Sequence, residues 1–200
     1  MRLFLIRHGQ TTCNLSEIWH GWDDCELTEA GRAQAEAVAE RLAREPIAAV
    51  YCSDLRRAIQ TAEAVARRHG LTPRTDLAFR ERSAGQFEGM READVVRVRP
   101  HVWEERAADF WAWSPPGGET FRELLARTMA GVERIRRSHP DETVVLVGHM
   151  GTVRALASHL GGIPMEKTYE MEFPSTGVST FDFDQESVRM SGLNDAAHVA

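Results

Sequence analysis

The 200-residue sequence lacks an apolar run long enough to cross a membrane, and its first residues lead into a short apolar segment without the pattern of a signal peptide. It also lacks a basic excess: the formal net charge is −6, whereas proteins with general affinity for nucleic acid usually carry surplus positive charge. We therefore expect neither a membrane nor a nucleic acid as partner. The ordinary length and apolar fraction predict one domain over residues 1–200.

Cysteine is scarce. Cys13, Cys25 and Cys52 form an odd set without the spacing of a disulfide framework, which predicts reduced thiols and a cytoplasmic location. A zinc site formed by Cys13, Cys25 and His20 would fit no common ligand spacing. A Gly-rich nucleotide-binding loop and a clear carboxylate cluster are also missing, so we expect no metal and no cofactor.

Apolar runs of strand length alternate with segments of helical periodicity through most of the chain. The predicted strands lie at residues 3–7, 47–52 and 143–147, with a closing hairpin at 178–183 and 187–193. The predicted helices lie at 28–44, 55–69, 92–113 with an interruption at Pro100, 121–139, and from 150 through 160. This order predicts an α/β three-layer sandwich, in which helices flank a mostly parallel central sheet. The tail from Asn194 is expected to be loosely held.

Polar and charged residues follow each of the three predicted buried strands, at residues 7–9, 53–57 and 148–149. If these strands are parallel neighbours, their carboxyl ends share one edge of the sheet, where α/β proteins bind ligands. The third segment also begins a helix, whose free N–H groups favour an anion. Arginine binds phosphoryl oxygens through bidentate charged hydrogen bonds. The sequence therefore predicts a phosphoryl-binding pocket formed by four side chains: Arg7, His8, Arg57 and His149. Gly9 is expected to let the backbone turn and approach the ligand closely.

Several motifs occur in a fixed order along the chain. They are Arg7-His8-Gly9 with Asn14 downstream, Gly21-Trp22-Asp23 leading to Leu27–Gly31, Ser53–Ala62, Glu81 before Gly85 and Glu88-Gly89, and Val147-Gly148-His149. Together they resemble the histidine phosphatase superfamily, in the branch that includes the cofactor-dependent phosphoglycerate mutases. The match extends from the first strand to beyond the last motif.

The resemblance implies a role for each matching residue. His8 would be the nucleophile and form a phosphohistidine, and Glu81 would donate a proton to the leaving group. Arg7, Arg57 and His149 would hold the phosphoryl oxygens. Arg57 rather than Arg56 precedes the alanine of the family pattern. A histidine attacks phosphorus only when neutral, and the nearby arginines disfavour a second proton on its ring. We expect the substrate to contact five further residues: Asn14, His20, Gly21, Arg82 and Met150.

Four departures from the pattern separate this chain from the mutases of the family. Only 68 positions separate Glu81 from His149, where mutases resemble one another in having a longer segment. Ala84 and Glu92 stand where mutases typically carry Tyr and Lys, and Gln10 replaces their Glu. The sequence therefore predicts a metal-independent phosphomonoesterase for a small phosphorylated metabolite.

Two alternatives remain open. The first is a 2,3-bisphosphoglycerate-dependent phosphoglycerate mutase. The second is a non-catalytic phospho-ligand-binding protein, although such proteins usually lose the nucleophile or the acid, and this chain keeps both. The sequence also leaves a homodimer open.

Overall fold

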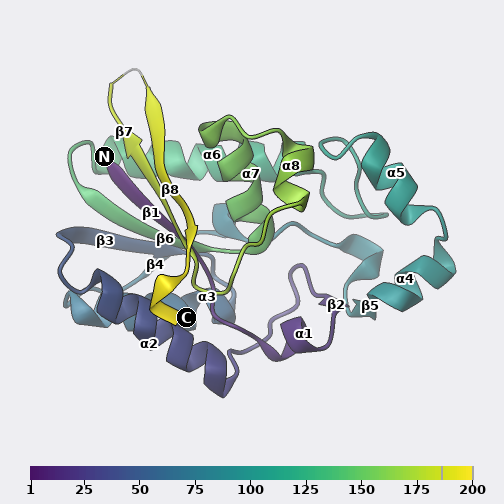
Figure 1. The fold of residues 1–200 in the computed structure, drawn as a ribbon, viewed down its shortest axis with the longest axis horizontal. Helices are drawn as coiled ribbons and strands as arrows, with labels where there is room; N and C mark the ends of the chain where they lie inside the picture. The colour runs from purple at the N-terminus through teal and green to yellow at the C-terminus, as the bar shows by residue number, and fades with distance from the viewer. Residues whose placement is uncertain (186, 200) are drawn as a thin grey trace.

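The computed structural model describes residues 1–185 and 187–199. Its main sheet has six strands in the order β4-β3-β6-β1-β7-β8 (Figure 1). These strands are β1 (Arg2–Arg7), β3 (Ile47–Cys52), β4 (Arg74–Thr75), β6 (Thr143–Gly148), β7 (Val178–Phe183) and β8 (Val188–Asp195). β6 lies between β1 and β3 and is parallel to both, and β4 is parallel to β3. β7 and β8 add an antiparallel hairpin at the other edge. The predicted mostly parallel sheet is confirmed.

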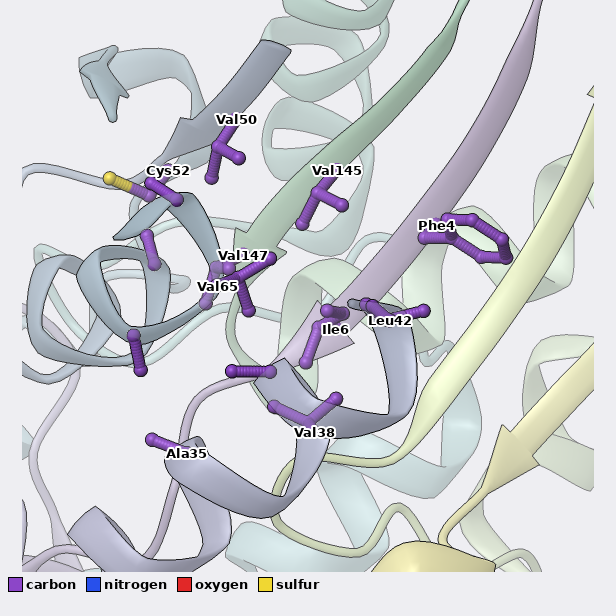
Figure 2. Close-up of a cluster of buried hydrophobic side chains, with 14 of the residues drawn as sticks. Phe4, Ile6, Ala35, Val38, Leu42, Val50, Cys52, Val65, Val145 and Val147 are labelled. Carbon is purple, nitrogen blue, oxygen red and sulfur yellow. The ribbon is translucent and has the colours of Figure 1, made fainter. Parts of the chain in front are cut away.

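Helices cover both faces of this sheet (Figure 1). They are α2 (Glu29–Leu42) and α3 (Arg56–Arg68) on one face, and α6 (Phe121–Ser138) and α7 (Met150–Gly161) on the other. Successive side chains of a strand point to opposite faces. Phe4 and Ile6 therefore join the core beneath α2 and α3, which Figure 2 shows, while Leu3 and Leu5 join the core beneath α6 and α7. This double coverage explains why β1 is apolar without alternation.

The short elements lie on the right in Figure 1, beyond the carboxyl ends of the parallel strands. They are α1 (Thr12–Leu15), α4 (Glu92–Val98), α5 (Val102–Ala108), α8 (Met165–Tyr169), the paired strands β2 (Ile18–Trp19) and β5 (Met90–Arg91), and a 3-10 turn at Gly85–Phe87. A second 3-10 turn, at Leu77–Phe79, packs against α6 instead. The helix predicted over 92–113 is thus two short helices. Pro100 disfavours helical backbone at Arg99, whose φ of −140° and ψ of 78° lie outside the helical region. The Asp109 side chain then accepts hydrogen bonds from the N–H groups of Trp111 and Ala112, so the residues after α5 form a turn instead of continuing the helix.

The loop after β1 packs backbone against backbone on the start of α2. A Cβ atom on Gly9 would lie 2.5 Å from the carbonyl oxygen of Gly31, and one on Gly31 would lie 2.0 Å from that of Gln10. Thr28 caps α2 as the sequence predicts, since its Oγ1 accepts a hydrogen bond from the Gly31 N–H at 2.9 Å. This close packing of backbone on backbone is enough to explain why position 9 is a glycine, whether or not its backbone also approaches a ligand.

The prediction of a loose tail is wrong for residues 194–199. Asn194 and Asp195 belong to β8, and Ala197–Val199 form a 3-10 turn. Arg41 on α2 donates to the Asp195 carboxylate at 2.6 Å, and the Asn194 amide donates to the Glu172 carbonyl at 2.7 Å. Within residues 1–185 and 187–199, no helix combines the length and apolar content that a bilayer crossing requires.

Candidate active site

The three strand ends meet at one edge of the sheet, as predicted. Arg7 lies opposite Gly148 in the β1–β6 register, and the backbone N–H of His8 donates to the Gly148 carbonyl at 3.0 Å. The ring centroids of His8 and His149 are 5.2 Å apart. Arg57, at the start of α3, donates its Nε–H to Nδ1 of His149 at 3.1 Å. Parallel pairing of β1 and β3 with β6 therefore brings together side chains that lie far apart in the sequence.

The hydrogen bonds of His8 decide which of its ring nitrogens can react. Nδ1 lies 2.7 Å from the carbonyl oxygen of Gly9. A carbonyl only accepts, so we assign the proton to Nδ1, which leaves a lone pair on Nε2. Burial, followed by the charges of Arg57 and Arg7, holds the pKa of His8 well below its usual 6.5. The sequence argument named the arginines as the reason why the ring of His8 stays neutral. The structure shows that burial lowers its pKa more than the arginines do. His8 is therefore a neutral imidazole.

His149 has the opposite tautomer. Its Nδ1 accepts from Arg57, so its proton lies on Nε2. That Nε2 is buried and has no hydrogen-bond partner among the described residues. Burial also holds the pKa of His149 well below its usual value, again ahead of the charge of Arg57. A buried donor without an acceptor is costly, so the site is suited to a ligand oxygen at this position.

The two adjacent arginines of α3 have different environments. Arg57 is fully buried and donates to the carbonyl oxygens of Asp23 at 2.7 Å and Gly21 at 2.8 Å. The Arg56 side chain is 62% exposed and pairs with Asp24 and Glu26. The structure thus places Arg57, and not Arg56, in the site.

Arg7 supplies a second guanidinium, which is half-buried. It donates to the carbonyl oxygen of Phe173, and its Nε has no partner among the described residues. Burial lowers the pKa of Arg7 and that of Arg57 to about 10, so both remain cations at neutral pH. Two cations and the ring of His149 therefore lie close to the ring of His8.

Glu81 lies against the first turn of α7, next to His149. Its Oε2 accepts the Gly151 backbone N–H at 3.0 Å, and its Oε1 accepts that of Arg82 at 2.7 Å. A Cβ atom on Gly151 would lie only 2.2 Å from Oε1 of Glu81, so a side chain at this position would displace the carboxylate. The carboxyl group is thus held beside the predicted phosphoryl pocket.

A cavity of about 390 Å³ opens in front of Glu81. Four of the five predicted substrate contacts line it: His20, Gly21, Arg82 and Met150. Asn14 does not, because its side-chain oxygen accepts from both the N–H and the hydroxyl of Thr11 and caps α1. A larger surface depression, of about 820 Å³, lies beside Met1 and α6, and no histidine or cysteine lines it.

Two arginines that the sequence analysis did not select also line the cavity in front of Glu81. They are Arg106 from α5 and Arg154 from α7. Arg154 follows Met150 by one helical turn, and residues four apart share a helix face. The spacing of Arg154 from Met150 could therefore have identified Arg154 from the sequence. No sequence pattern could have identified Arg106, because only the tertiary fold brings α5 to the cavity.

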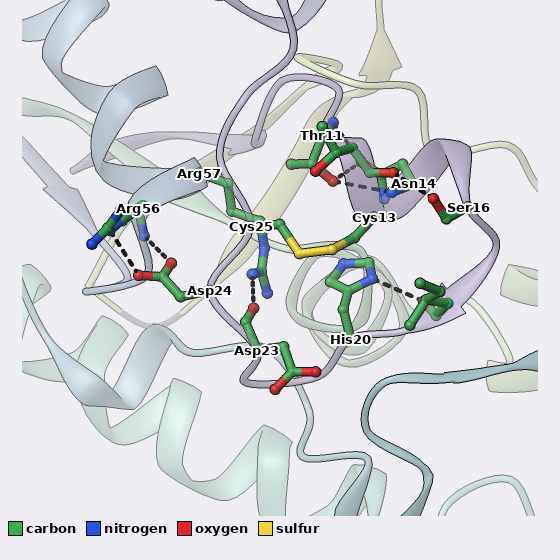
Figure 3. The surroundings of a disulfide bond; sticks show 12 residues. Thr11, Cys13, Asn14, Ser16, His20, Asp23, Asp24, Cys25, Arg56 and Arg57 are labelled. Atoms are coloured by element: carbon green, nitrogen blue, oxygen red, sulfur yellow. Dashed lines mark hydrogen bonds and ion pairs between the residues drawn. A yellow bond between two sulfur atoms is a disulfide. The ribbon is translucent and has the colours of Figure 1, made fainter.

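The prediction of three reduced thiols is wrong. Cys13 and Cys25 form a disulfide (Figure 3). Cys52 is free and buried. α1 reverses the chain, which brings two cysteines twelve residues apart within bonding distance. The pairing also excludes the zinc site considered with His20. Burial raises the pKa of Cys52 to about 12. The sequence analysis inferred a cytoplasmic location from reduced cysteines, and the disulfide removes that argument.

The disulfide closes the loop that faces the phosphoryl pocket. This loop supplies the carbonyls of Gly21 and Asp23 to Arg57, and the Trp22 indole N–H donates to the Glu81 carbonyl at 2.7 Å. A Cβ atom on Gly21, whose φ is +36°, would lie 2.7 Å from the Ala84 nitrogen. In the part of the chain that the structure describes, no three His, Cys, Asp or Glu side chains gather in a way that could hold a metal ion.

Comparison with known proteins agrees with this geometry. The glucosyl-3-phosphoglycerate phosphatase of Mycobacterium tuberculosis is 37% identical over 175 residues, which cover 82% of this chain and 77% of that protein. The metal-independent phosphoserine phosphatase of Arabidopsis thaliana is 35% identical over 161 residues, covering 77% and 66%. Among solved structures, Bacillus stearothermophilus YhfR superposes with a TM-score of 0.92 at 28% identity, covering 100% of this chain and 99% of that one.

The sequence profile of the histidine phosphatase superfamily (branch 1) matches residues 3–196, nearly the whole chain. The order of motifs, the sheet edge where they meet and the similarity to phosphatases lead to one assignment. This chain belongs to the histidine phosphatase superfamily and is a phosphatase of its phosphoglycerate mutase-like branch.

Proposed function

We propose that the chain hydrolyses small phosphomonoesters in two steps through a phosphohistidine at His8, without a metal ion. One observation carries this proposal: Nδ1 of His8 is occupied by the Gly9 carbonyl, so the free lone pair of Nε2 belongs to a neutral ring beside two cations. Transfer of a loose, highly charged phosphoryl group depends mainly on positioning and charge stabilisation. Arg7, Arg57 and the N–H of His149 supply both.

In the first step, Nε2 of His8 forms a bond to phosphorus while the bond from phosphorus to the ester oxygen breaks. Glu81, in its protonated form, gives its proton to the departing oxygen and becomes a carboxylate. In the second step, this carboxylate takes a proton from a water molecule as the water oxygen attacks phosphorus. The N–P bond breaks, inorganic phosphate leaves, and His8 and protonated Glu81 are restored.

The similarity to phosphatases of glucosyl-3-phosphoglycerate and phosphoserine supports a small phosphorylated metabolite as substrate. The cavity volume of about 390 Å³ fits a small molecule. In this proposal, His20, Gly21, Arg82 and Met150 contact the organic part. Contact between Asn14 and the phosphate or the substrate stays a prediction, because the Asn14 side chain is hydrogen-bonded to Thr11.

The test is hydrolysis of a panel of phosphomonoesters in EDTA by the wild type and by His8→Ala, with the exposed His159→Ala as matched control. His8→Ala should lose activity by about 10⁴-fold or more. Acid-labile phosphoenzyme should be trapped in the wild type and in His159→Ala only. A mutase rate equal to the phosphatase rate, with added bisphosphoglycerate, would favour the mutase. Phosphate-ester binding without any turnover would favour the binding protein.

The remaining proposals concern the context of the enzyme. We infer one domain over residues 1–200 and no nucleic-acid or membrane partner. The cytoplasmic location, which reduced cysteines no longer support, stays a prediction that cell fractionation tests. A homodimer stays a prediction, which light scattering of the purified protein tests.

A further inference from the structure

Glu81 lies in a stretch of chain that has no regular secondary structure. The 3-10 turn at Leu77–Phe79 ends before it, and residues 81–84 belong to no helix or strand. In a helix or a strand, backbone carbonyls accept hydrogen bonds from other backbone groups, whereas in an irregular stretch they need other donors. The position of the Glu81 carboxyl group therefore depends on the side chains that bind the backbone of this stretch.

The side chain of Arg127, on α6, binds the backbone around Glu81. Its Nη1 donates to the carbonyls of Ala78 at 2.9 Å and Arg80 at 2.8 Å, and its Nη2 donates to that of Glu81 at 2.8 Å. Its Nε and Nη2 donate to the two carboxylate oxygens of Glu119, at 2.6 Å and 2.7 Å. A guanidinium has five N–H donors in one plane, and these contacts use all of them. The guanidinium is therefore fixed relative to the main chain at Glu81.

Glu119, the carboxylate partner of Arg127, is tied to the same stretch. Its backbone N–H donates to the Ser83 carbonyl at 3.1 Å, and its carboxylate accepts the Ser83 N–H at 3.4 Å. The Arg82 side chain donates to the Glu119 carbonyl at 3.2 Å. The side chains of Arg127 and Glu119 are only 22% and 14% exposed, so solvent screens this ion pair little. The pair thus binds the chain on both sides of Glu81.

Arg127 differs from the arginines that line the cavity in front of Glu81. Arg106 and Arg154 line it, and their guanidinium carbons lie 4.4 Å and 4.2 Å from the centroid of the Tyr169 ring, in cation–π contacts. Arg127 does not line the cavity. Because its five donors are all used within the protein, it keeps none for a phosphoryl oxygen. Arg127 can therefore influence the reaction only through the groups that it binds.

The Glu81 carboxyl group connects this framework to the phosphoryl pocket. Its Oε2 accepts the N–H of Gly151 at 3.0 Å, in the first turn of the helix that begins after His149. A shift of the main chain at Glu81 would break this hydrogen bond and would move the carboxyl group away from the departing oxygen. Because proton transfer needs the acid within hydrogen-bond distance, a displacement of about 1 Å is costly.

We propose that Arg127, held by Glu119, is a positioning residue for Glu81: it fixes the main chain so that the Glu81 carboxyl group lies within reach of the departing ester oxygen. This inference rests on the proposed phosphatase function, in which Glu81 is the general acid. The loss of Arg127 should therefore be large only for esters whose leaving oxygen needs a proton. A residue that merely stabilised the fold would affect every ester equally.

The first experiment measures kcat/KM of Arg127→Gln for glycerol 3-phosphate and for p-nitrophenyl phosphate. For the alkyl ester, kcat/KM should fall by about tenfold. The loss is partial because the Trp22 indole still donates to the Glu81 carbonyl. For p-nitrophenyl phosphate, whose leaving group departs as an anion, kcat/KM should fall by less than about threefold. Equal losses on the two esters would overturn the inference.

Three further variants define the role of the guanidinium. Arg137→Gln, at an exposed position of the same helix, is the matched control and should change neither rate. Arg127→Lys should recover only part of the loss, because an ammonium group has three donors for five acceptors. Full recovery would overturn the inference, since a point charge would then suffice. Glu119→Gln, which weakens the hold on Arg127, should show the same dependence on the leaving group with a smaller loss.

A double variant tests whether Arg127 acts through Glu81. In Glu81→Gln the acid is already absent, so the position of the side chain no longer affects the leaving group. Adding Arg127→Gln to Glu81→Gln should therefore lower kcat/KM for glycerol 3-phosphate by less than about twofold. A double variant that loses the product of the two single losses would show that the residues act independently, and would overturn the inference.

Amide hydrogen exchange separates this inference from the proposed function, because it needs no turnover. In Arg127→Gln, the Gly151 amide should exchange about tenfold faster, since its acceptor on Glu81 is displaced. The Val153 amide, which donates to the His149 carbonyl at 2.9 Å, should keep its rate and so show that the helix stays folded.

The two outcomes of hydrogen exchange have different consequences. An unchanged rate at Gly151 would overturn the inference and leave the phosphatase intact. If the wild type hydrolyses no phosphomonoester, the proposed function fails, whereas faster exchange at Gly151 would still support the hold of Arg127 on the Glu81 carboxyl group.

Discussion

The phosphoryl pocket and the cavity wall of this enzyme are built in different ways. The proposed phosphoryl pocket consists of Arg7, His8, Arg57 and His149, which lie at or after the ends of strands whose register is fixed by the sheet. Most of the cavity wall comes from short elements and turns, at residues 17–21, 81, 82, 84, 92 and 106, and the rest comes from the first turns of α6 and α7. Ladder hydrogen bonds and burial hold the pocket, whereas a disulfide, cation–π contacts and side-chain hydrogen bonds hold the wall. Phosphoryl chemistry common to the family can thus stay constant while the wall sets the substrate.

The sharpest test of this division is the arginine pair of α3. Arg57→Ala removes a buried cation and the donor that fixes the tautomer of His149, and should lower kcat by about 10² to 10³-fold for every phosphomonoester. Arg56→Ala, one residue away but exposed, should change kcat by less than about twofold. Steady-state kinetics on p-nitrophenyl phosphate and phosphoserine measure both. Equal losses in the two variants would mean that the pocket is not confined to the buried face of α3.

Glu81 lies where the pocket and the wall meet, and its replacement should depend on the leaving group. Glu81→Gln keeps the shape of the side chain but cannot transfer the proton. Hydrolysis of alkyl phosphates should fall by about 10²-fold, because an alkoxide leaves poorly without a general acid. p-Nitrophenol leaves readily as an anion, so its ester should lose much less. The ratio of the two rates is the measurement, and an equal loss on both esters would remove Glu81 from the acid role.

The sequence predicted the pocket better than the wall, for a physical reason. Apolar runs identify buried strands, and the residue after such a run must lie at the edge of the sheet. The positions of His8 and His149 follow from that alone, once the strands are parallel neighbours. Choosing Arg57 over Arg56 required the family pattern, because helical periodicity places both at the start of one helix.

The wall depends on contacts that no local pattern encodes. The helix expected over 92–113 broke at Pro100, and this break is what carries Arg106 of α5 to the cavity. The pairing of Cys13 with Cys25 depends on the turn made by α1, which is only four residues long. Short elements with few buried residues leave little periodicity to detect.

The buried imidazoles predict how stability depends on pH. In the unfolded chain, His8 and His149 bind protons near pH 6.5, whereas in the folded protein their pKa values are well below this. Between these values the unfolded state binds more protons, so stability is lost as the pH falls below 6.5. At pH 5 each histidine should shift the folding equilibrium constant by at most about thirtyfold, the limit set by the unfolded pKa. Urea unfolding at pH 7.5 and pH 5 measures the shift.

The control for this measurement is a pair of histidine variants. His8→Ala should lose the part of the pH dependence that one buried histidine contributes, while the exposed His159→Ala should keep the dependence of the wild type. Because carboxylates contribute equally to all three proteins, the differences among them isolate the imidazole. An unchanged dependence in His8→Ala would contradict a buried neutral ring at this position.

The smallest expected effect concerns the disulfide, and it tests the boundary between pocket and wall. Reduction of Cys13–Cys25 frees the loop that carries Gly21 and the Asp23 carbonyl, but leaves every strand end in place. Ordering that loop upon substrate binding then costs free energy, so dithiothreitol should raise KM by about threefold and change kcat by less than twofold. Cys13→Ser should have the raised KM from the outset and no longer respond to dithiothreitol. If reduction instead lowers kcat and leaves KM alone, the loop positions Arg57 for the chemical step and belongs to the pocket.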